Sequence, residues 1–208
     1  MLETTSPTIF TATSAYSLAG VAGLGTVAYV ANRVPSQERT HAGQVYTFDA
    51  LIHFIFEGSF LWNSMFGRSV NTGTNMFAEM WREYAAADFR WGTSDPTVVS
   101  LEILTVLGAG PMAAYIVYQI VRNDPARHYW LVVLSTAELY GGWMTFCPEW
   151  LTGSPNLDTS NALFLWVYLV LMNTIWVFIP FWLMFDSYGH IAGTLRKVQT
   201  QIDPKKTT

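Results

Sequence analysis

The chain has 208 residues, of which 51% are hydrophobic and only 12% are charged, about half the charged fraction of an average soluble domain. Its 11 Lys and Arg residues would leave a water-exposed surface of this size poorly covered, which excludes an ordinary soluble domain. The net charge of -4 indicates no nucleic-acid partner, and Cys147, as the only cysteine, can form neither an intrachain disulfide nor a cysteine-based zinc site. We therefore expect the chain to be surrounded mainly by membrane lipid.

Five stretches approach the roughly 20 apolar residues that a membrane-spanning helix needs. The first is rich in glycine and alanine, which permits close helix packing in lipid and is compatible with a homodimer. The fold class we predict is an all-α integral membrane protein with a bundle of five transmembrane helices. The predicted spans are residues 9–31, 46–66, 98–121, 128–147 and 162–185.

Polar segments connect the predicted spans. Residues 35–43 form a hydrophilic connector, and residues 75–91 mix charges with aromatic residues and methionines three and four positions apart. The second pattern predicts an amphipathic helix at the membrane interface. We expect three parts: residues 1–45 with the first transmembrane helix and the connector, residues 46–188 as a four-helix membrane domain, and residues 189–208 as a cytosolic basic tail.

The Lys and Arg residues predict the orientation, because cytoplasmic loops carry the excess of positive charge. A cytosolic C-terminus would place eight of the eleven on the cytosolic side. The chain ends in Lys205, Lys206, Thr207 and Thr208, similar to the dilysine retrieval signal of endoplasmic-reticulum membrane proteins. The alternative is that this tail binds anionic lipid headgroups. We expect a multi-pass protein of the endoplasmic-reticulum membrane with its C-terminus in the cytosol.

Ionisable residues within spanning helices are costly to place in lipid, so they mark a functional site by default. Asp49, His53 and Glu57 recur every four residues of the second span, which places them on one helical face. Polar residues on the third, fourth and fifth spans could converge with this face and form an intramembrane polar pocket. They are Glu102 and Thr105, Glu138 and Tyr140, and Asn173 and Trp176.

Such a pocket has the groups needed for acid–base chemistry on an alkene. A carboxyl group that burial keeps protonated can donate a proton, and a second carboxyl group held ionised by Thr105 or Asn173 can accept one. A carbocation formed in between would be stabilised by the π-face of Trp176 and by carboxylate charge. The result is a double-bond shift in an apolar substrate, which needs no cofactor and no metal.

Several of these residues also have a structural interpretation. His53 and Glu57 could be a hydrogen-bonded pair that joins two helices, and Asn173 could tether neighbouring helices. Asp49 lies close to the predicted start of the second span, which is more typical of an interfacial cap. Tyr140 could belong to the aromatic belt at the membrane interface.

Separated motifs in a consistent order along residues 46–188 resemble a known family. They are His53-Phe-Ile-Phe-Glu57-Gly-Ser-Phe, Trp81-Arg-Glu-Tyr84 followed by Asp88 and Arg90, Val99-Ser-Leu-Glu102-Ile-Leu-Thr105, Gly110-Pro111, Leu139-Tyr140-Gly141, and Met172-Asn173 with Trp176 and Pro180. The chain thereby resembles the emopamil-binding protein family, whose shared EXPERA domain spans four helices. Residues 138–146 and 148–157 are most similar to the emopamil-binding-protein-like branch.

The resemblance implies a five-helix protein of the endoplasmic reticulum that, in the enzymatic members, moves a sterol double bond from the 8 to the 7 position. It also implies roles for the residues that stand in the shared motifs. His53 and Glu57 match the acid–base pair, Glu102 with Thr105 matches the second carboxyl site, Asn173 with Trp176 matches the wall facing the cationic intermediate, and Tyr84, Asp88, Glu138 and Tyr140 are expected to contact the substrate.

Two positions depart from the family pattern. Gly142 stands where the vertebrate isomerase has an acid, and Glu138 stands where isomerases have an amide. An added carboxyl group changes how protons are shared in the pocket, because coupled sites titrate as a group.

We predict a membrane isomerase of the cholestenol delta-isomerase type, with Glu57 or His53 as proton donor and Glu102 as counter-charge or base. Its substrate would be a hydrophobic polycyclic sterol. One alternative is the same acid–base chemistry, isomerisation or cyclisation, on a terpenoid of a specialised pathway. The other is a non-catalytic regulator that binds sterols or amphipathic amines.

Overall fold

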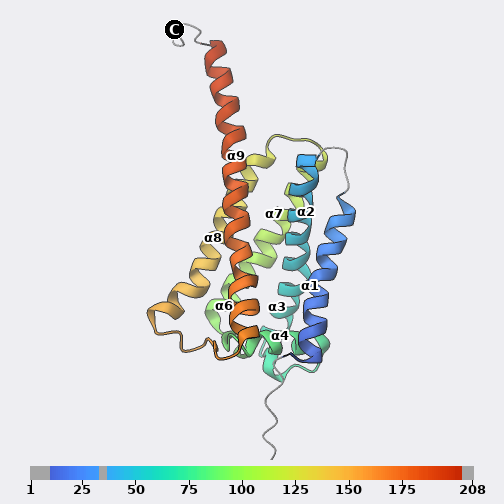
Figure 1. Ribbon diagram of the computed structural model, residues 1–208, viewed down its shortest axis with the longest axis vertical. Helices are drawn as coiled ribbons and strands as arrows, with labels where there is room; N and C mark the ends of the chain where they lie inside the picture. The colour runs from blue at the N-terminus through green and yellow to red at the C-terminus, as the bar shows by residue number, and fades with distance from the viewer. Residues whose placement is uncertain (1–9, 33–36, 203–208) are drawn as a thin grey trace, which may run out of the picture.

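The computed structural model describes residues 10–32 and 37–202, which fold into helices and contain no strand (Figure 1). The predicted all-α class is thus confirmed for these residues. Segments η1, η3 and η4 are π-helical, and η2 is a 3₁₀ turn. In chain order the elements are α1 (Ala12–Ala31), α2 (Gln37–Leu51), η1 (Ile52–Glu57), α3 (Gly58–Ser64), η2 (Val70–Thr72), α4 (Met76–Ala85), α5 (Arg90–Thr93), α6 (Pro96–Leu104), η3 (Thr105–Ala109), α7 (Gly110–Val121), α8 (Arg127–Leu151), η4 (Leu163–Leu171) and α9 (Met172–Ile202).

Several elements join end to end, so that the described residues form five long helical runs arranged as a bundle (Figure 1). The composite runs are α2-η1-α3, α6-η3-α7 and η4-α9, and the other two are α1 and α8. Among the described residues, three helices are long and apolar enough to cross a membrane: Ala12–Ala31, Pro96–Val121 and Leu163–Ile202. Ionisable residues of the predicted site lie on the composite run α2-η1-α3 and on α8.

The two largest differences from the predicted helix boundaries both lengthen a helix. α2 begins at Gln37, so the predicted connector over residues 35–43 is helical from residue 37 onward. α9 continues to Ile202, so the predicted tail is helical up to that residue, while Lys205 and Lys206 lie outside the described residues. Backbone hydrogen bonding can continue a helix past its apolar segment, whereas the prediction bounded each helix by hydropathy.

The predicted amphipathic segment, residues 75–91, folds as α4, a tight turn and the start of the short α5, at the end of the bundle where α1 begins (Figure 1). The Asn75 side chain caps α4 by accepting a hydrogen bond of 3.0 Å from the backbone N–H of Ala78. The hydroxyl of Ser14, on α1, donates to the carboxyl group of Glu83 on α4. The cap starts α4, and the contact with α1 fixes it against the bundle.

Packing anchors the composite run α2-η1-α3 on both sides of its π-helical segment. Before that segment, Ala50 belongs to a buried apolar cluster with Ile116 of α7 and Leu134 of α8. After it, Phe60 packs against the indole rings of Trp81 and Trp91. The helical face that carries the predicted site residues is therefore held at both ends.

Candidate active site

The imidazole of His53 lies between two carboxyl groups of its own helical run. Nδ1 is 2.5 Å from Oε2 of Glu57, and Nε2 is 3.1 Å from Oδ1 of Asp49. All three side chains are largely buried: their exposed fractions are 5% for His53, 2% for Asp49 and 14% for Glu57. The four-residue spacing that predicted a shared face is thus confirmed, and the ring bridges two acids.

Glu102 of α6 supplies the second carboxyl site that the sequence predicts. It is buried, and the hydroxyl of Thr105 donates to its Oε2 at 3.1 Å and to its backbone carbonyl at 3.0 Å. The side chain of Glu57 also lies next to the side chains of Glu102 and Thr105. Glu57 therefore connects His53 to Glu102, and the four side chains form one continuous polar group.

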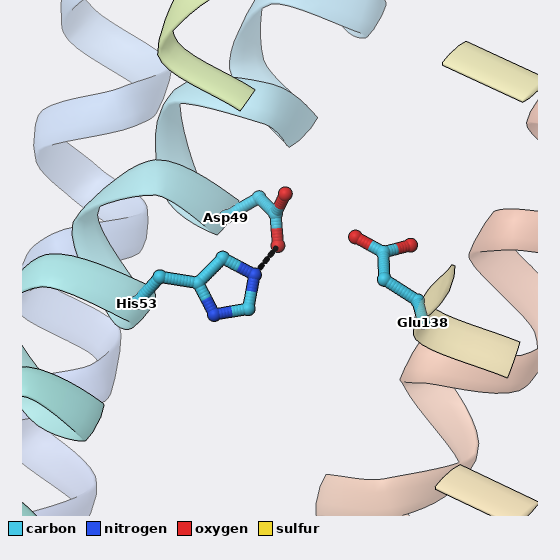
Figure 2. Close-up of side chains that lie close together, drawn as sticks. All are labelled: Asp49, His53 and Glu138. Carbon is cyan, nitrogen blue, oxygen red and sulfur yellow. Dashed lines mark ion pairs between the residues drawn. The ribbon is translucent and has the colours of Figure 1, made fainter. Parts of the chain in front are cut away.

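A third acid approaches His53 from another helix. Glu138 of α8 points toward Asp49 and His53 (Figure 2), and one oxygen or nitrogen atom from each of the three side chains lies within 4.8 Å of the others. Asp49 is 1% exposed, and neither of its oxygens has a hydrogen bond of good geometry. The interpretation of Asp49 as an interfacial cap is wrong, because α2 begins twelve residues before it and carries it into the bundle.

Aromatic rings and a close helix contact hold His53 in place. The indole of Trp176, on α9, stacks on the His53 ring at a centroid distance of 6.0 Å and on Phe48 at 6.4 Å. At Gly110, where α7 begins, a Cβ atom would lie 3.1 Å from Cβ of His53, so glycine permits this approach. Trp176 is therefore placed beside His53, one of the predicted acid–base residues.

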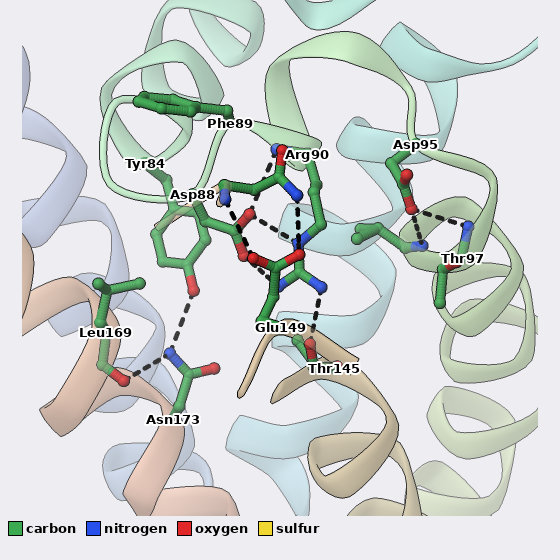
Figure 3. Close-up of polar contacts among 12 residues, drawn as sticks. Tyr84, Asp88, Phe89, Arg90, Asp95, Thr97, Thr145, Glu149, Leu169 and Asn173 are labelled. Atoms are coloured by element: carbon green, nitrogen blue, oxygen red, sulfur yellow. Dashed lines mark hydrogen bonds and ion pairs between the residues drawn. The ribbon is translucent and has the colours of Figure 1, made fainter. Parts of the chain in front are cut away.

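Asn173, one helical turn before Trp176, contacts Tyr84 of α4 (Figure 3). Its amide group donates to the Tyr84 hydroxyl at 3.1 Å and to the backbone carbonyls of Tyr168 and Leu169 at 2.8 and 3.1 Å. Burial raises the pKa of Tyr84 above its ordinary value, which keeps the phenol neutral. These hydrogen bonds agree with the interpretation that Asn173 tethers neighbouring helices. Contact of Asn173 or Tyr84 with the substrate stays a prediction.

Asp88 takes part in a buried ion-pair network (Figure 3). Arg90 donates from Nε to Oδ1 of Asp88 at 2.9 Å, from Nη2 to Oδ2 at 2.6 Å, and from Nη1 to the carbonyl of Thr145 at 2.7 Å. Oε1 of Glu149 is 3.7 Å from Arg90 Nε. Burial lowers the pKa of Arg90, but the hydrogen bonds and charge of Asp88 outweigh this effect and hold that pKa above its ordinary value.

Three π-helical segments lie next to the predicted site residues. His53 and Glu57 are part of η1, Thr105 begins η3, and Asn173 is the second residue after η4. A π-helical turn redirects side chains relative to an α-helix and is frequent at functional sites. The π-helical turns and the side-chain chemistry thus indicate the same residues as a functional site.

The structure brings most of the predicted residues together and leaves one apart. His53, Glu57, Glu102, Thr105, Glu138 and Trp176 lie in or beside the polar group, and Tyr84, Asp88 and Asn173 form the neighbouring contacts in Figure 3. Tyr140 is 64% exposed on the outside of α8. Sequence reasoning missed Glu149 as a partner of Arg90; it placed Asp49 on the same helical face as His53 but interpreted it as a cap.

Comparisons with known proteins agree with the resemblance drawn from the motifs. The family model EXPERA (EXPanded EBP superfamily) matches residues 76–187, more than half of the chain. The chain is 30% identical over 154 residues to the 3-beta-hydroxysteroid-Delta(8),Delta(7)-isomerase of Rattus norvegicus, which covers 74% of this chain and 64% of that protein. It is 31% identical over 158 residues to the probable 3-beta-hydroxysteroid-Delta(8),Delta(7)-isomerase of Oryza sativa subsp. japonica, with 75% and 70% covered.

Plant enzymes with other names are also similar. The chain is 28% identical over 130 residues to the isomeliandiol synthase of Melia azedarach, which covers 62% of this chain and 59% of that protein. The matched part of the chain covers about two thirds of the length of the mammalian 3-beta-hydroxysteroid-Delta(8),Delta(7)-isomerases. It covers 67% of the protein from Cavia porcellus and 64% of the protein from Mus musculus.

Proposed function

Because the chain belongs to the EXPERA (EXPanded EBP superfamily) family, we propose that it is a membrane isomerase that moves a double bond in a sterol from the 8 to the 7 position. The rat and rice relatives are named for this shift. The observation that carries the proposal is the polar group His53–Glu57–Glu102, because two neighbouring carboxyl groups, one of them paired with an imidazole, suit a proton donor and a proton acceptor in one buried site.

In the proposed reaction, the His53–Glu57 pair gives a proton to one alkene carbon. The second alkene carbon then carries the positive charge. Glu102 takes a proton from the carbon next to the cation, and the electron pair of that C–H bond forms the new double bond. Protons and electrons balance within one turnover, so the step needs no cofactor and no metal. Proton transfer from Glu102 back to Glu57, which lies within reach, would reset the pair.

Charge and rings around this pocket suit the cationic intermediate. Glu57 and Glu102 place negative charge in a water-poor surrounding, where it acts strongly on a developing cation. The Trp176 ring beside His53 adds its negative π-face. The sterol would enter from the lipid, which is where an apolar polycyclic molecule is most concentrated.

We further propose that all five helical runs cross the membrane of the endoplasmic reticulum and that the C-terminus is cytosolic. The bundle in Figure 1 supports this, because α2-η1-α3 and α8 run alongside the three helices that are apolar enough to span. Their polar residues face the interior of the bundle around His53, an arrangement by which ionisable groups are tolerated within a membrane.

A terpenoid substrate is the second candidate, and Glu138 is the observation that favours it. The similarity extends to plant proteins named isomeliandiol synthase and protoglabretal synthase. An additional carboxyl group beside His53 could direct protonation to a different position of a related polycyclic molecule.

The test of the proposed function is expression in yeast that lacks its own sterol 8,7-isomerase, followed by mass spectrometry of the sterols. We expect 7-ene sterols to accumulate with the parent chain and 8-ene sterols to persist with an empty vector. Persistent 8-ene sterols in cells where the tagged chain is folded and in the endoplasmic reticulum would contradict the sterol assignment. In that case conversion of a supplied terpenoid would favour the second candidate, and binding of amphipathic amines without any turnover would indicate a regulator.

Replacement of Trp176 tests the role of its ring. Trp176→Leu is expected to lower turnover on the order of 30-fold, because a desolvated cation gains about 2 kcal/mol from an aromatic face and 1.36 kcal/mol is a tenfold change in rate. Trp176→Phe keeps a ring and should lose clearly less. The measurement is the rate of 7-ene sterol formation in membranes with matched amounts of each variant. Equal losses in the two variants would assign Trp176 to packing against His53 instead.

A further inference from the structure

Two acids on the Nε2 side of His53 have no part in the reaction just described. Asp49 is 1% exposed, and both of its oxygens and Nε2 of His53 have no hydrogen bond of good geometry. Buried polar atoms without partners are rare and call for an explanation. Nε2 of His53 lies 3.1 Å from Oδ1 of Asp49, and Glu138 faces both side chains from α8 (Figure 2).

The His53 ring connects this pair of acids to the other pair. Its Nδ1 contacts Glu57, which reaches Glu102, and its Nε2 faces Asp49, which is close to Glu138. An imidazole can accept a proton on one nitrogen while it releases the proton on the other. The ring is therefore placed to pass protons between the two carboxyl pairs.

Glu138 is placed as the outer end of this series. It is half-buried, whereas Asp49 and His53 are buried. One helical turn further along α8, at Gly141 and Gly142, an added Cβ atom would meet nothing within 4 Å. Glu138 is thus the member of the series that can be reached from outside the bundle, whereas Asp49 is enclosed.

We propose that Glu138 and Asp49 exchange protons between the outside of the bundle and the His53–Glu57 pair, an inference that rests on the proposed isomerase function. Glu138 passes a proton to Asp49, Asp49 passes it to Nε2 of His53, and the ring releases the Nδ1 proton to Glu57. Each step moves one proton between oxygen and nitrogen atoms and changes no other bond. The reverse sequence removes the proton that Glu102 has taken from the substrate and returned to Glu57.

Whether this proton route is open determines where the proton that the product gains comes from. With the route open, the proton taken from one substrate molecule is lost to water before the next turnover. With the route cut, Glu102 returns that proton to Glu57, and the next substrate molecule receives it. Glu138 and Asp49 supply protons to His53 and remove protons from it. In this reaction they do not touch the substrate themselves.

The experiment uses the purified full chain in lipid nanodiscs and a sterol deuterated at the carbon that loses its proton, in ordinary water. For the parent chain we expect product without deuterium at the carbon that gains a proton. For Glu138→Gln we expect product molecules that carry transferred deuterium, and we expect KM to be unchanged. Loss of a group in direct contact with the reacting atoms lowers kcat by roughly 100-fold or more. The fall in kcat for Glu138→Gln should be smaller than that.

Asp49→Asn should give the same transfer of deuterium, which keeps the test decisive if one variant folds poorly. Glu79→Gln is the matched control, because Glu79 accepts a hydrogen bond from Tyr16 at the end of the bundle and should behave like the parent chain. An active parent chain whose Glu138→Gln and Asp49→Asn variants transfer no deuterium would overturn the exchange route alone. A parent chain with no isomerase activity would overturn the proposed function together with it.

Discussion

Glu57→Gln is expected to lower turnover in the proposed sterol isomerisation by about 100- to 10,000-fold, the range that loss of a general acid or base costs. Glutamine keeps the shape of the side chain and can still hydrogen-bond to His53, whose Nδ1 lies 2.5 Å from Glu57 in the parent chain. Its amide, however, neither gives nor takes a proton at neutral pH. The proton path between His53 and Glu102 is thereby broken while the packing remains.

Turnover and binding have to be measured side by side for this variant. The rate of 7-ene sterol formation in membranes reports the chemistry, and displacement of a labelled hydrophobic tertiary amine, which imitates the cation, reports the pocket. We expect the variant to bind the amine and to be almost inactive, and Glu79→Gln to match the parent chain in both. If turnover persisted at the parent rate, Glu57 could not be the donor, and the acid role would pass to His53 alone.

Arg90→Met is expected to destabilise the fold by about 3–5 kcal/mol, the cost of removing one partner from a buried ion pair. Arg90 donates to both oxygens of Asp88 at 2.9 and 2.6 Å and to the carbonyl of Thr145 at 2.7 Å, and Glu149 lies 3.7 Å away. Methionine fills much of the volume but leaves two buried acids without a cation. The turn after α4 would also lose its connection to α8.

The apparent free energy of unfolding, from denaturant titration in detergent, checks this prediction. The double variant Arg90→Met with Asp88→Asn should recover part of the loss, because it removes one of the uncompensated charges. Arg122→Met serves as the control, since Arg122 is exposed and contacts only the ring and hydroxyl of Tyr118 in the described residues. A change below about 1 kcal/mol for Arg90→Met, the level of an exposed pair, would mean that Asp88 and Glu149 are not charged in the fold.

The acid–base residues could be predicted from the sequence because their spacing and chemistry are local. His53 and Glu57 are four residues apart on one helix, and Glu102 and Thr105 are three apart on another, so helical geometry alone pairs them. Convergence of the separate helices followed from the cost of ionisable groups in lipid, which drives them toward one another. The span over residues 98–121 was likewise predicted almost to its observed ends.

Other features depended on information that hydropathy does not contain. Asp49 was predicted to lie near the start of its helix because the polar residues after Gln37 were interpreted as a connector. The helix in fact begins at Gln37. The outward position of Tyr140 was available from the sequence, since residues two apart on a helix point about 200° apart and Glu138 faces inward. The pairing of Asp88 with Arg90 was not available, because Asp88 lies in the turn between α4 and α5 and Arg90 is the first residue of α5, so no regular period relates the directions of the two side chains.

The π-helical segments bear on how chains of this family are compared. A π-helical turn contains one residue more than the α-helical turn it replaces, because its hydrogen bonds reach one residue further. Deleting one residue from η1 would let the backbone return to an α-helix without losing hydrogen bonds, and the two flanking helices would keep their relative orientation because the π-helical turn accommodates the extra residue. In an alignment, a single-residue gap between Ile52 and Glu57 would therefore predict an unchanged bundle in which the side chains of His53 and Glu57 alone point in new directions.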